Sequence, residues 1–137
     1  MNILFFITPK VDVAYVYDHS TIRQVLESME HHMYSSIPLI NQSGKYIGTI
    51  TEGDLLWGIK NITDLDLKSA EHHLITEIPR KADYVAVKAD SDMVDLIQKA
   101  KNQNFVPVVD DQQNFIGIIT RKSIIEYCYE NLNEEDK

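Results

Sequence analysis

The short segment from Gly48 to Asp54 has the residue types that could hold an anion. It ends an apolar stretch, Tyr46–Ile50, and precedes a helical-looking run, Leu55–Ile59. A threonine at such a junction can cap the new helix with its hydroxyl, and an aspartate three residues later fits a capping box. The free N–H groups of a helix end also attract phosphate and other anions. On this segment alone, a plain helix cap and an anion site are both open.

The same pattern occurs again as Gly117 to Ser123. The glycines of the two copies are 69 residues apart, and so are the threonines and the prolines Pro38 and Pro107. Between proline and glycine each copy has a polar stretch typical of a hairpin connection between buried strands. An internal repeat of about sixty residues therefore organises the chain, and it decides the fold.

Both halves contain the order strand, helix, strand, strand, helix, which predicts an α/β (α+β) fold. Short β-branched or aromatic runs predict strands at residues 11–17, 37–40, 46–50, 84–88, 105–109 and 115–119. Apolar residues at helical spacing predict helices at residues 22–33, 55–59, 94–101 and 122–129. Each βαββα repeat would leave one sheet face uncovered, so we expect the two to pack with pseudo-twofold symmetry around a shared core.

The domain organisation follows from the repeat. We expect a first repeat with its N-terminal segment at residues 1–62, a connector at 63–73, a second repeat at 74–131 and an acidic tail at 132–137. The end of the chain, from residue 131, is predicted to be solvated and frayed. In the first helix of the second repeat, the apolar spacing of Val94, Ile97 and Ala100 to Lys101 predicts the face that packs on the core.

Composition excludes several classes of partner. The 137 residues carry a net charge of −8, which opposes non-specific binding to nucleic acid or anionic lipid. The opening apolar run, Ile3–Ile7, is too short to span a bilayer. One cysteine, Cys128, allows no internal disulfide. We therefore expect a cytoplasmic protein without nucleic-acid or membrane partners.

These motifs resemble a known family. Two copies of apolar-Pro-apolar-apolar, a polar hairpin and Gly-x-x-Thr-x-x-Asp or a near variant are similar to a tandem pair of CBS (cystathionine β-synthase type) domains, over roughly residues 5–130. The resemblance implies a disc-like module with two clefts and further homodimerisation. It also implies an adenine nucleotide as a regulatory ligand, with no cofactor.

The resemblance further implies that each cleft combines the entering strand and proline loop of one repeat with the Gly-x-x-Thr turn of the other. The first cleft would use Thr8, Val13, Ala14, Tyr34, Ser36, Ile37, Thr120, Arg121 and Ser123. The second would use Thr76, Val85, Ala86, Phe105, Val106, Thr51 and Asp54.

The chemistry of these positions suits a nucleotide. Short strands offer an apolar slot edged by backbone groups for adenine. The Asp54 carboxylate could accept from a ribose diol, and Thr120 with Arg121 could bind phosphate oxygens. Because Ser123 replaces the aspartate, the second turn would suit a 3′ oxygen that is already esterified, as in cyclic di-AMP. The alternative for Arg121 is a solvated first-turn residue.

A closer resemblance supports cyclic di-AMP. Residues 13–16, 34–38, 75–80 and 117–122 are similar to stand-alone bacterial CBS pairs that sense this nucleotide. The chain departs from them by keeping Asp54, which leaves AMP, ADP or ATP as the alternative ligand of the second cleft.

Other chemistry has little support in the sequence. The pairs His31-His32 and His72-His73 are adjacent, so on helices their side chains diverge and do not form a metal site. Cys128 has no cysteine partner and is expected to be a packed residue. No catalytic motif stands out, so we expect no enzyme. Three hypotheses follow: a sensor that signals to an unknown regulated protein, a ligand-independent dimerisation scaffold, and an enzyme acting on a nucleotide.

Overall fold

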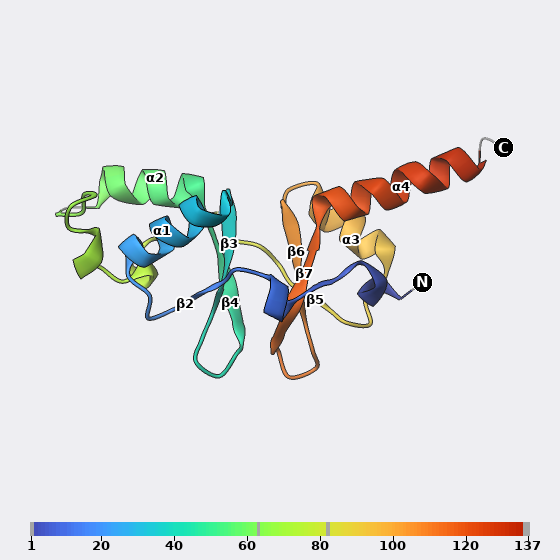
Figure 1. Ribbon diagram of the computed structural model, residues 1–137, viewed down its shortest axis with the longest axis horizontal. Coiled ribbons are helices and arrows are strands. Elements are labelled where there is room, and N and C mark those ends of the chain that lie inside the picture. Colours follow the sequence, from blue (N-terminus) through green and yellow to red (C-terminus); the bar gives the residue numbers. More distant parts are fainter. Residues whose placement is uncertain (1, 63, 82, 136–137) are drawn as a thin grey trace. The chain divides into compact units, whose positions relative to one another are not determined.

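The computed structural model describes residues 2–62, 64–81 and 83–135. They group into two compact units (Figure 1). The α1–α2 unit is Ala14–Asp83, and the α3–α4 unit combines Met1–Val13 with Tyr84–Lys137. The first thirteen residues therefore belong to the compact unit that contains the second repeat. Residue 63 of the predicted connector and residues 136–137 of the predicted tail lie outside the described residues, and the domain boundaries stay predictions.

The α1–α2 unit has a three-stranded sheet with two helices. The strands are β2 (Val16–Tyr17), β3 (Ser36–Ile40) and β4 (Tyr46–Thr51), with β2 parallel and β4 antiparallel to β3. Figure 1 shows α1 (Ile22–His32) and α2 (Glu52–Asn61) on the same side of this sheet. The hairpin expected between Pro38 and Gly48 is formed by β3 and β4, which are neighbours in the sheet order β2-β3-β4.

Helix α1 begins at a capping box, as its sequence suggests. The Thr21 hydroxyl accepts a hydrogen bond from Gln24 N (3.1 Å), and Gln24 Oε1 accepts from Thr21 N (2.9 Å). Ile22, Val25 and Met29 on one face of the helix are buried in the core of the unit. The apolar spacing of this helix therefore identified its buried face, although Met33 at the end is 86% exposed.

The segment after α2 packs back onto α1. It contains two short 3₁₀ helices, η3 (Ala70–His72) and η4 (Ile75–Glu77). Ile22 N donates to His73 O (2.9 Å), and Ile75 N donates to Ser20 O (2.8 Å). Its apolar residues join the same core: Leu65, Ala70, Ile75 and Ile78. Most of the predicted connector is thus part of the α1–α2 unit.

A histidine–glutamate pair in this segment gives a pH-dependent stability. His73 Nδ1 lies 3.1 Å from Glu77 Oε1, and this hydrogen bond is the main cause that raises the pKa of His73 and lowers the pKa of Glu77. The contribution of His73 to the free energy of unfolding is fully present below its ordinary pKa of 6.5. It is lost as pH rises through the raised pKa. The contribution of Glu77 to the free energy of unfolding is fully present above its ordinary pKa of 4.5. It is lost as pH falls through the lowered pKa.

Glu77→Gln should therefore lower the melting temperature by a small amount near pH 5.5, and by less near pH 8, where only the hydrogen bond from Leu74 N to Glu77 Oε2 (2.8 Å) is weakened. Thermal melts of both proteins at the two pH values test this, and an equal difference at both would contradict it. NMR titration should also show a lower pKa for His73 in the variant.

The α3–α4 unit has a four-stranded sheet in the order β1-β7-β6-β5. These strands are β1 (Thr8–Pro9), β5 (Val87–Lys88), β6 (Phe105–Val109) and β7 (Phe115–Thr120). The helices are α3 (Met93–Ala100) and α4 (Arg121–Glu135), and two 3₁₀ helices, η1 (Ile3–Phe6) and η2 (Lys10–Asp12), flank β1. Strand β1 pairs antiparallel with β7, so the N-terminal segment completes the sheet.

The order strand, helix, strand, strand, helix is confirmed in both repeats, but the two entering strands are shorter than predicted. Residues 11–12 belong to η2, because Val13 N donates to Lys10 O (3.1 Å) and closes a 3₁₀ turn. Val85 bonds to the Gln103 side chain and not to a neighbouring strand. Its N–H donates to Gln103 Oε1 (2.9 Å), and its carbonyl accepts from Gln103 Nε2 (3.2 Å).

The predicted buried face of α3 is wrong at Val94 and Ile97, whereas Ala100 packs against the core as predicted. Met93 and Leu96 are buried, whereas Val94 is 65% and Ile97 is 37% exposed. Both pairs have helical spacing, so periodicity could not choose between them. The frayed tail predicted from residue 131 is also wrong as far as Glu135, because α4 continues to that residue.

Candidate functional site

The turn between β4 and α2 is a complete capping box. The Thr51 hydroxyl accepts from Asp54 N (3.1 Å), and Asp54 Oδ2 accepts from Thr51 N (3.1 Å). Thr51 also faces Ser36 across the β3–β4 ladder. The helix start is therefore rigidly joined to the sheet, which fixes the direction in which its free N–H groups point.

Asp54 has a second role that reaches beyond its own turn. Its Oδ1 accepts from Lys81 N (3.0 Å), and the residue is only 3% exposed. Both carboxylate oxygens therefore hold backbone N–H groups of the same unit. Each oxygen can still accept a further hydrogen bond. A small pocket of about 70 Å³ beside it is lined by Asp54, Trp57, Gly58, Asn61, Ile62, Pro79 and Lys81.

The equivalent turn between β7 and α4 contains hydroxyls in place of the carboxylate. Thr120 Oγ1 accepts from Ser123 N (3.1 Å) and lies 2.9 Å from Ser123 Oγ. Arg121 N donates to Asn104 O (2.9 Å), which ties the turn to the segment before β6. The helix start thus keeps the threonine cap of its counterpart but has a hydroxyl contact in place of the carboxylate.

Arg121 lies against the C-terminal end of α3. Its Nε donates to Ala100 O (2.8 Å) and Gln103 O (3.1 Å). A cation at this position also interacts favourably with the negative end of the α3 dipole. Within the described residues, its two terminal nitrogens make no hydrogen bond or ion pair. Arg121 is therefore held in place while its planar donor pair stays available, and it is not a freely solvated side chain.

Comparison with known families identifies the fold. A sequence model described as "CBS domain" matches residues 6–61 and 75–130. The chain belongs to the CBS domain family. Its two matches are the two repeats found from the glycine, threonine and proline spacing, and the tandem CBS fold is confirmed.

Relatives of this CBS pair include stand-alone and larger proteins. The crystal structure of CbpB in complex with c-di-AMP is 25% identical, with a TM-score of 0.83 over 99% of this chain and 89% of that chain. An uncharacterized Methanocaldococcus jannaschii protein is 24% identical over 90% of this chain, which spans 48% of that protein. The gamma subunit of the Saccharomyces cerevisiae 5′-AMP-activated protein kinase is 30% identical over 75% of this chain, which spans 33% of that subunit.

Each predicted ligand set of this CBS pair draws on both compact units, so both sets stay predictions. In the first set, Thr8, Val13, Thr120, Arg121 and Ser123 belong to the α3–α4 unit, and Ala14, Tyr34, Ser36 and Ile37 to the α1–α2 unit. In the second set, Val85, Ala86, Phe105 and Val106 belong to the α3–α4 unit, and Thr51, Asp54 and Thr76 to the α1–α2 unit.

Within each unit the predicted residues differ in what they can offer a ligand. Thr8 pairs with Ile118 in the β1–β7 ladder. Ile37 and Val106 are fully buried, so neither side chain offers a surface to a ligand. Thr76 is exposed, and Val85 is 59% exposed. The turns bring together Thr51 with Asp54 and Thr120 with Ser123, as the sequence predicts.

Sequence reasoning missed three residues that organise these turns. Asp83 Oδ1 accepts from Thr49 N (2.8 Å), and Asp83 Oδ2 accepts from Arg80 Nε (3.0 Å), so this pair lies over Gly48. Gln103 is buried and orients both Val85 and Arg121. The similarity of Pro79-Arg80 to Pro9-Lys10 could have indicated Arg80, but no local pattern marks Asp83 or Gln103.

The remaining observations concern metal ligands, membrane-spanning helices and the free cysteine. Among residues 2–62, 64–81 and 83–135, no group of three or more His, Cys, Asp or Glu side chains could hold a metal ion. Within the same ranges, no helix is both apolar and long enough to cross a membrane. Cys128 is a half-buried free thiol.

Proposed function

We propose that this CBS pair is a non-catalytic regulatory module that binds an adenine nucleotide, with cyclic di-AMP as the favoured ligand. The observation that carries the proposal is the difference between the two turns. In the α3–α4 unit a held guanidinium, two hydroxyls and a helix N-terminus occur together without a carboxylate. This set suits phosphate oxygens and a ribose whose 3′ oxygen is esterified. Similarity to CbpB, a protein crystallised with c-di-AMP, supports the same ligand class.

AMP, ADP or ATP is the alternative ligand, and it would use Asp54. The Asp54 carboxylate can accept from a ribose diol only in addition to Thr51 N and Lys81 N. Similarity to a subunit of the AMP-activated kinase supports a mononucleotide. In either case, occupancy would act on a regulated protein, because a ligand shifts an equilibrium by its different affinity for two states. As part of the same proposal, the module works as a homodimer in the cytoplasm.

A ligand-independent dimerisation scaffold is the second candidate. It is favoured by the capping bonds of Thr51, Asp54, Thr120 and Ser123, since each of these side chains already satisfies a backbone N–H or a neighbouring hydroxyl. Under this hypothesis the two turns serve only the fold.

Ligand binding is measured by thermal shift with cyclic di-AMP, AMP, ADP, ATP and S-adenosylmethionine. A ligand at a hundred times its dissociation constant should add about 2.7 kcal/mol and raise the melting temperature by several degrees. We expect the largest shift with cyclic di-AMP. No shift with any of the five would favour the scaffold, and turnover of a nucleotide by the pure protein would contradict the non-catalytic proposal.

Arg121→Lys should weaken cyclic di-AMP binding by about tenfold to a hundredfold, because an ammonium cannot reproduce the bidentate donor pair. Lys88→Ala, which removes an exposed cation of the same unit, is the matched control and should bind normally. Calorimetry of both variants gives the affinities. If Arg121→Lys binds like the parent protein while Asp54→Asn loses a mononucleotide, the Asp54 turn is the site instead.

A further inference from the structure

The two helices of the α1–α2 unit line an apolar groove with a volume of about 570 Å³. Each helix contributes one face, with the spacing i, i+3, i+4 and i+7. On α1 these residues are Leu26, Met29, Glu30 and Met33. On α2 they are Glu52, Leu55, Leu56 and Ile59. Residues with this spacing form one stripe on a helix, so the groove is bordered by a stripe from each helix.

The apolar side chains of this groove form a buried floor and an exposed rim. Met29 and Leu55 are buried in the core of the unit. Met33, Leu56 and Leu67, which also belong to the lining, are 86%, 59% and 67% exposed. Large apolar side chains that gather at one exposed surface mark a site of interaction.

Met33 provides a second observation that points to a partner. It ends α1 in the left-handed conformation, with φ 57° and ψ 38°. Glycine or asparagine is the usual residue in that conformation, because most side chains are strained there. The position instead carries a flexible apolar side chain that its own unit leaves exposed. Packing of the fold gives no reason for methionine here, whereas contact with a partner does.

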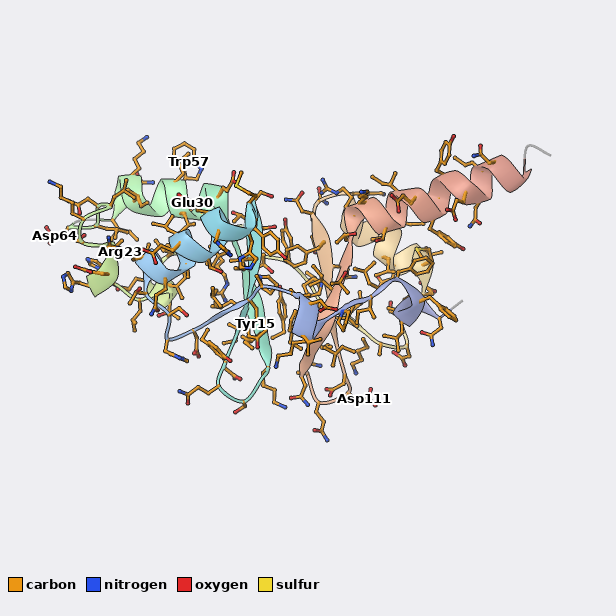
Figure 2. All side chains as sticks on the ribbon, in the orientation of Figure 1. Tyr15, Arg23, Glu30, Trp57, Asp64 and Asp111 are labelled. Carbon is orange, nitrogen blue, oxygen red and sulfur yellow. The ribbon has the colours of Figure 1, made fainter. Side chains whose placement is uncertain are left out.

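The charged residues of the groove lining are Glu27, Glu30 and Glu52. Glu27 forms an ion pair with Arg23 at 3.4 Å. Among residues 2–62, 64–81 and 83–135, no ion pair involves Glu30, which Figure 2 labels, or Glu52. Two unpaired carboxylates beside an apolar floor favour an occupant that is both apolar and cationic. They oppose nucleic acid and anionic lipid.

We propose that this groove binds an amphipathic helix of another protein, whose apolar face is flanked by lysine or arginine. A third helix can pack its side chains between those of two neighbouring helices, and its anchors would have the same i, i+3, i+4, i+7 spacing. Helix α1 has 11 residues and is about 16 Å long, so three turns of the partner cover the groove. The inference rests on the proposed function in one respect: the helix belongs to the regulated protein.

A synthetic helical peptide tests the proposal without nucleotide. The probe is about four turns long, with leucines at i, i+3, i+4 and i+7 and lysines beside them. One control peptide has glutamate in place of every lysine, and another has the same residues in scrambled order. Fluorescence anisotropy should give a micromolar dissociation constant for the lysine peptide and no saturable binding of either control. Because nucleotide is absent, this result and the thermal-shift result are independent of each other.

Charge reversal in the groove should reverse the preference between the peptides. Glu30→Lys with Glu52→Lys should weaken binding of the lysine peptide on the order of a hundredfold and should allow the glutamate peptide to bind. The matched control is Asp12→Lys with Asp111→Lys, which changes the net charge equally but lies in the α3–α4 unit and should bind like the parent. Circular dichroism checks that each variant is folded.

Met33→Asn separates a role in binding from a role in the fold. Asparagine tolerates the left-handed conformation, so the variant should be at least as stable as the parent. The loss of the apolar anchor should weaken binding of the lysine peptide about tenfold.

The proposal is overturned if the lysine peptide does not bind saturably, if both double variants bind it equally, or if Met33→Asn binds it like the parent. Sedimentation velocity identifies the remaining alternative. A parent protein that does not bind the peptide but self-associates, and loses that association in the Glu30 and Glu52 variant, would have its groove occupied by a second copy. That result would also overturn the proposal.

Discussion

Gly117→Ala is expected to lower the free energy of unfolding by about 2 to 4 kcal/mol. Gly117 lies in β7 with a positive φ of 157°. A Cβ added there would collide with the carbonyl oxygen of Thr8 and approach Ile7 Cδ1 to 2.9 Å. Because Thr8 is held in the β1–β7 ladder, its backbone cannot move away without loss of that pairing. Urea denaturation of the variant and the parent measures the difference.

Gly53→Ala is the matched control for this prediction. Gly53 lies in the first turn of α2, and the nearest atom to an added Cβ is Thr51 Oγ1 at 3.8 Å. Alanine favours a helix by up to about 1 kcal/mol over glycine, so this variant should be as stable as the parent or more stable. Equal stability of Gly117→Ala and the parent would show that the first residues of the chain do not pack on β7.

Asp54→Ala is expected to destabilise the α1–α2 unit by about 3 kcal/mol. The substitution removes the acceptor of Thr51 N and of Lys81 N, both of which are bonded to a charged and buried carboxylate. Hydrogen bonds to charged groups contribute about 1.5 to 3 kcal/mol each, and part of that is recovered when water reaches the freed N–H groups. Chemical denaturation of the variant, without ligand, is the measurement.

Ser123→Ala at the equivalent position provides the comparison. It removes only the hydroxyl contact with Thr120, so we expect a loss of no more than about 1 kcal/mol. A similar loss of stability for both substitutions would show that the hydrogen bond from Lys81 N to Asp54 adds no stability. If Asp54→Ala were as stable as the parent, the carboxylate would serve a ligand and not the fold.

Local patterns in the sequence were sufficient to predict the repeated elements and both turns. The spacing of Thr51 and Asp54 predicted a capping box, and the structure has one. The hairpins between Pro38 and Gly48 and between Pro107 and Gly117 were predicted from the same short-range chemistry. These features depend on residues a few positions apart, so they can be read from a single chain.

Features set by distant residues could not be predicted in this way. The N–H of Val85, shortly before the strand that precedes α3, donates to Gln103, which is 18 residues away. The partner of Thr49 N is Asp83, 34 residues away. The face that α3 buries is decided by its packing against the sheet and α4, since two faces had suitable spacing. The ligand sets depend on pairing between repeats and were supplied by family resemblance.

The two compact units do not coincide with the two sequence repeats, and this determines where the chain can be cut into fragments that fold. A fragment that stops at residue 62 omits Ile75 and Ile78, two fully or almost fully buried members of its own core. Residues 14–83 form a continuous stretch that retains every member of that core. The other unit is discontinuous, so a minimal version of it has to be a rearranged chain in which residues 2–13 are joined to residues 84–135.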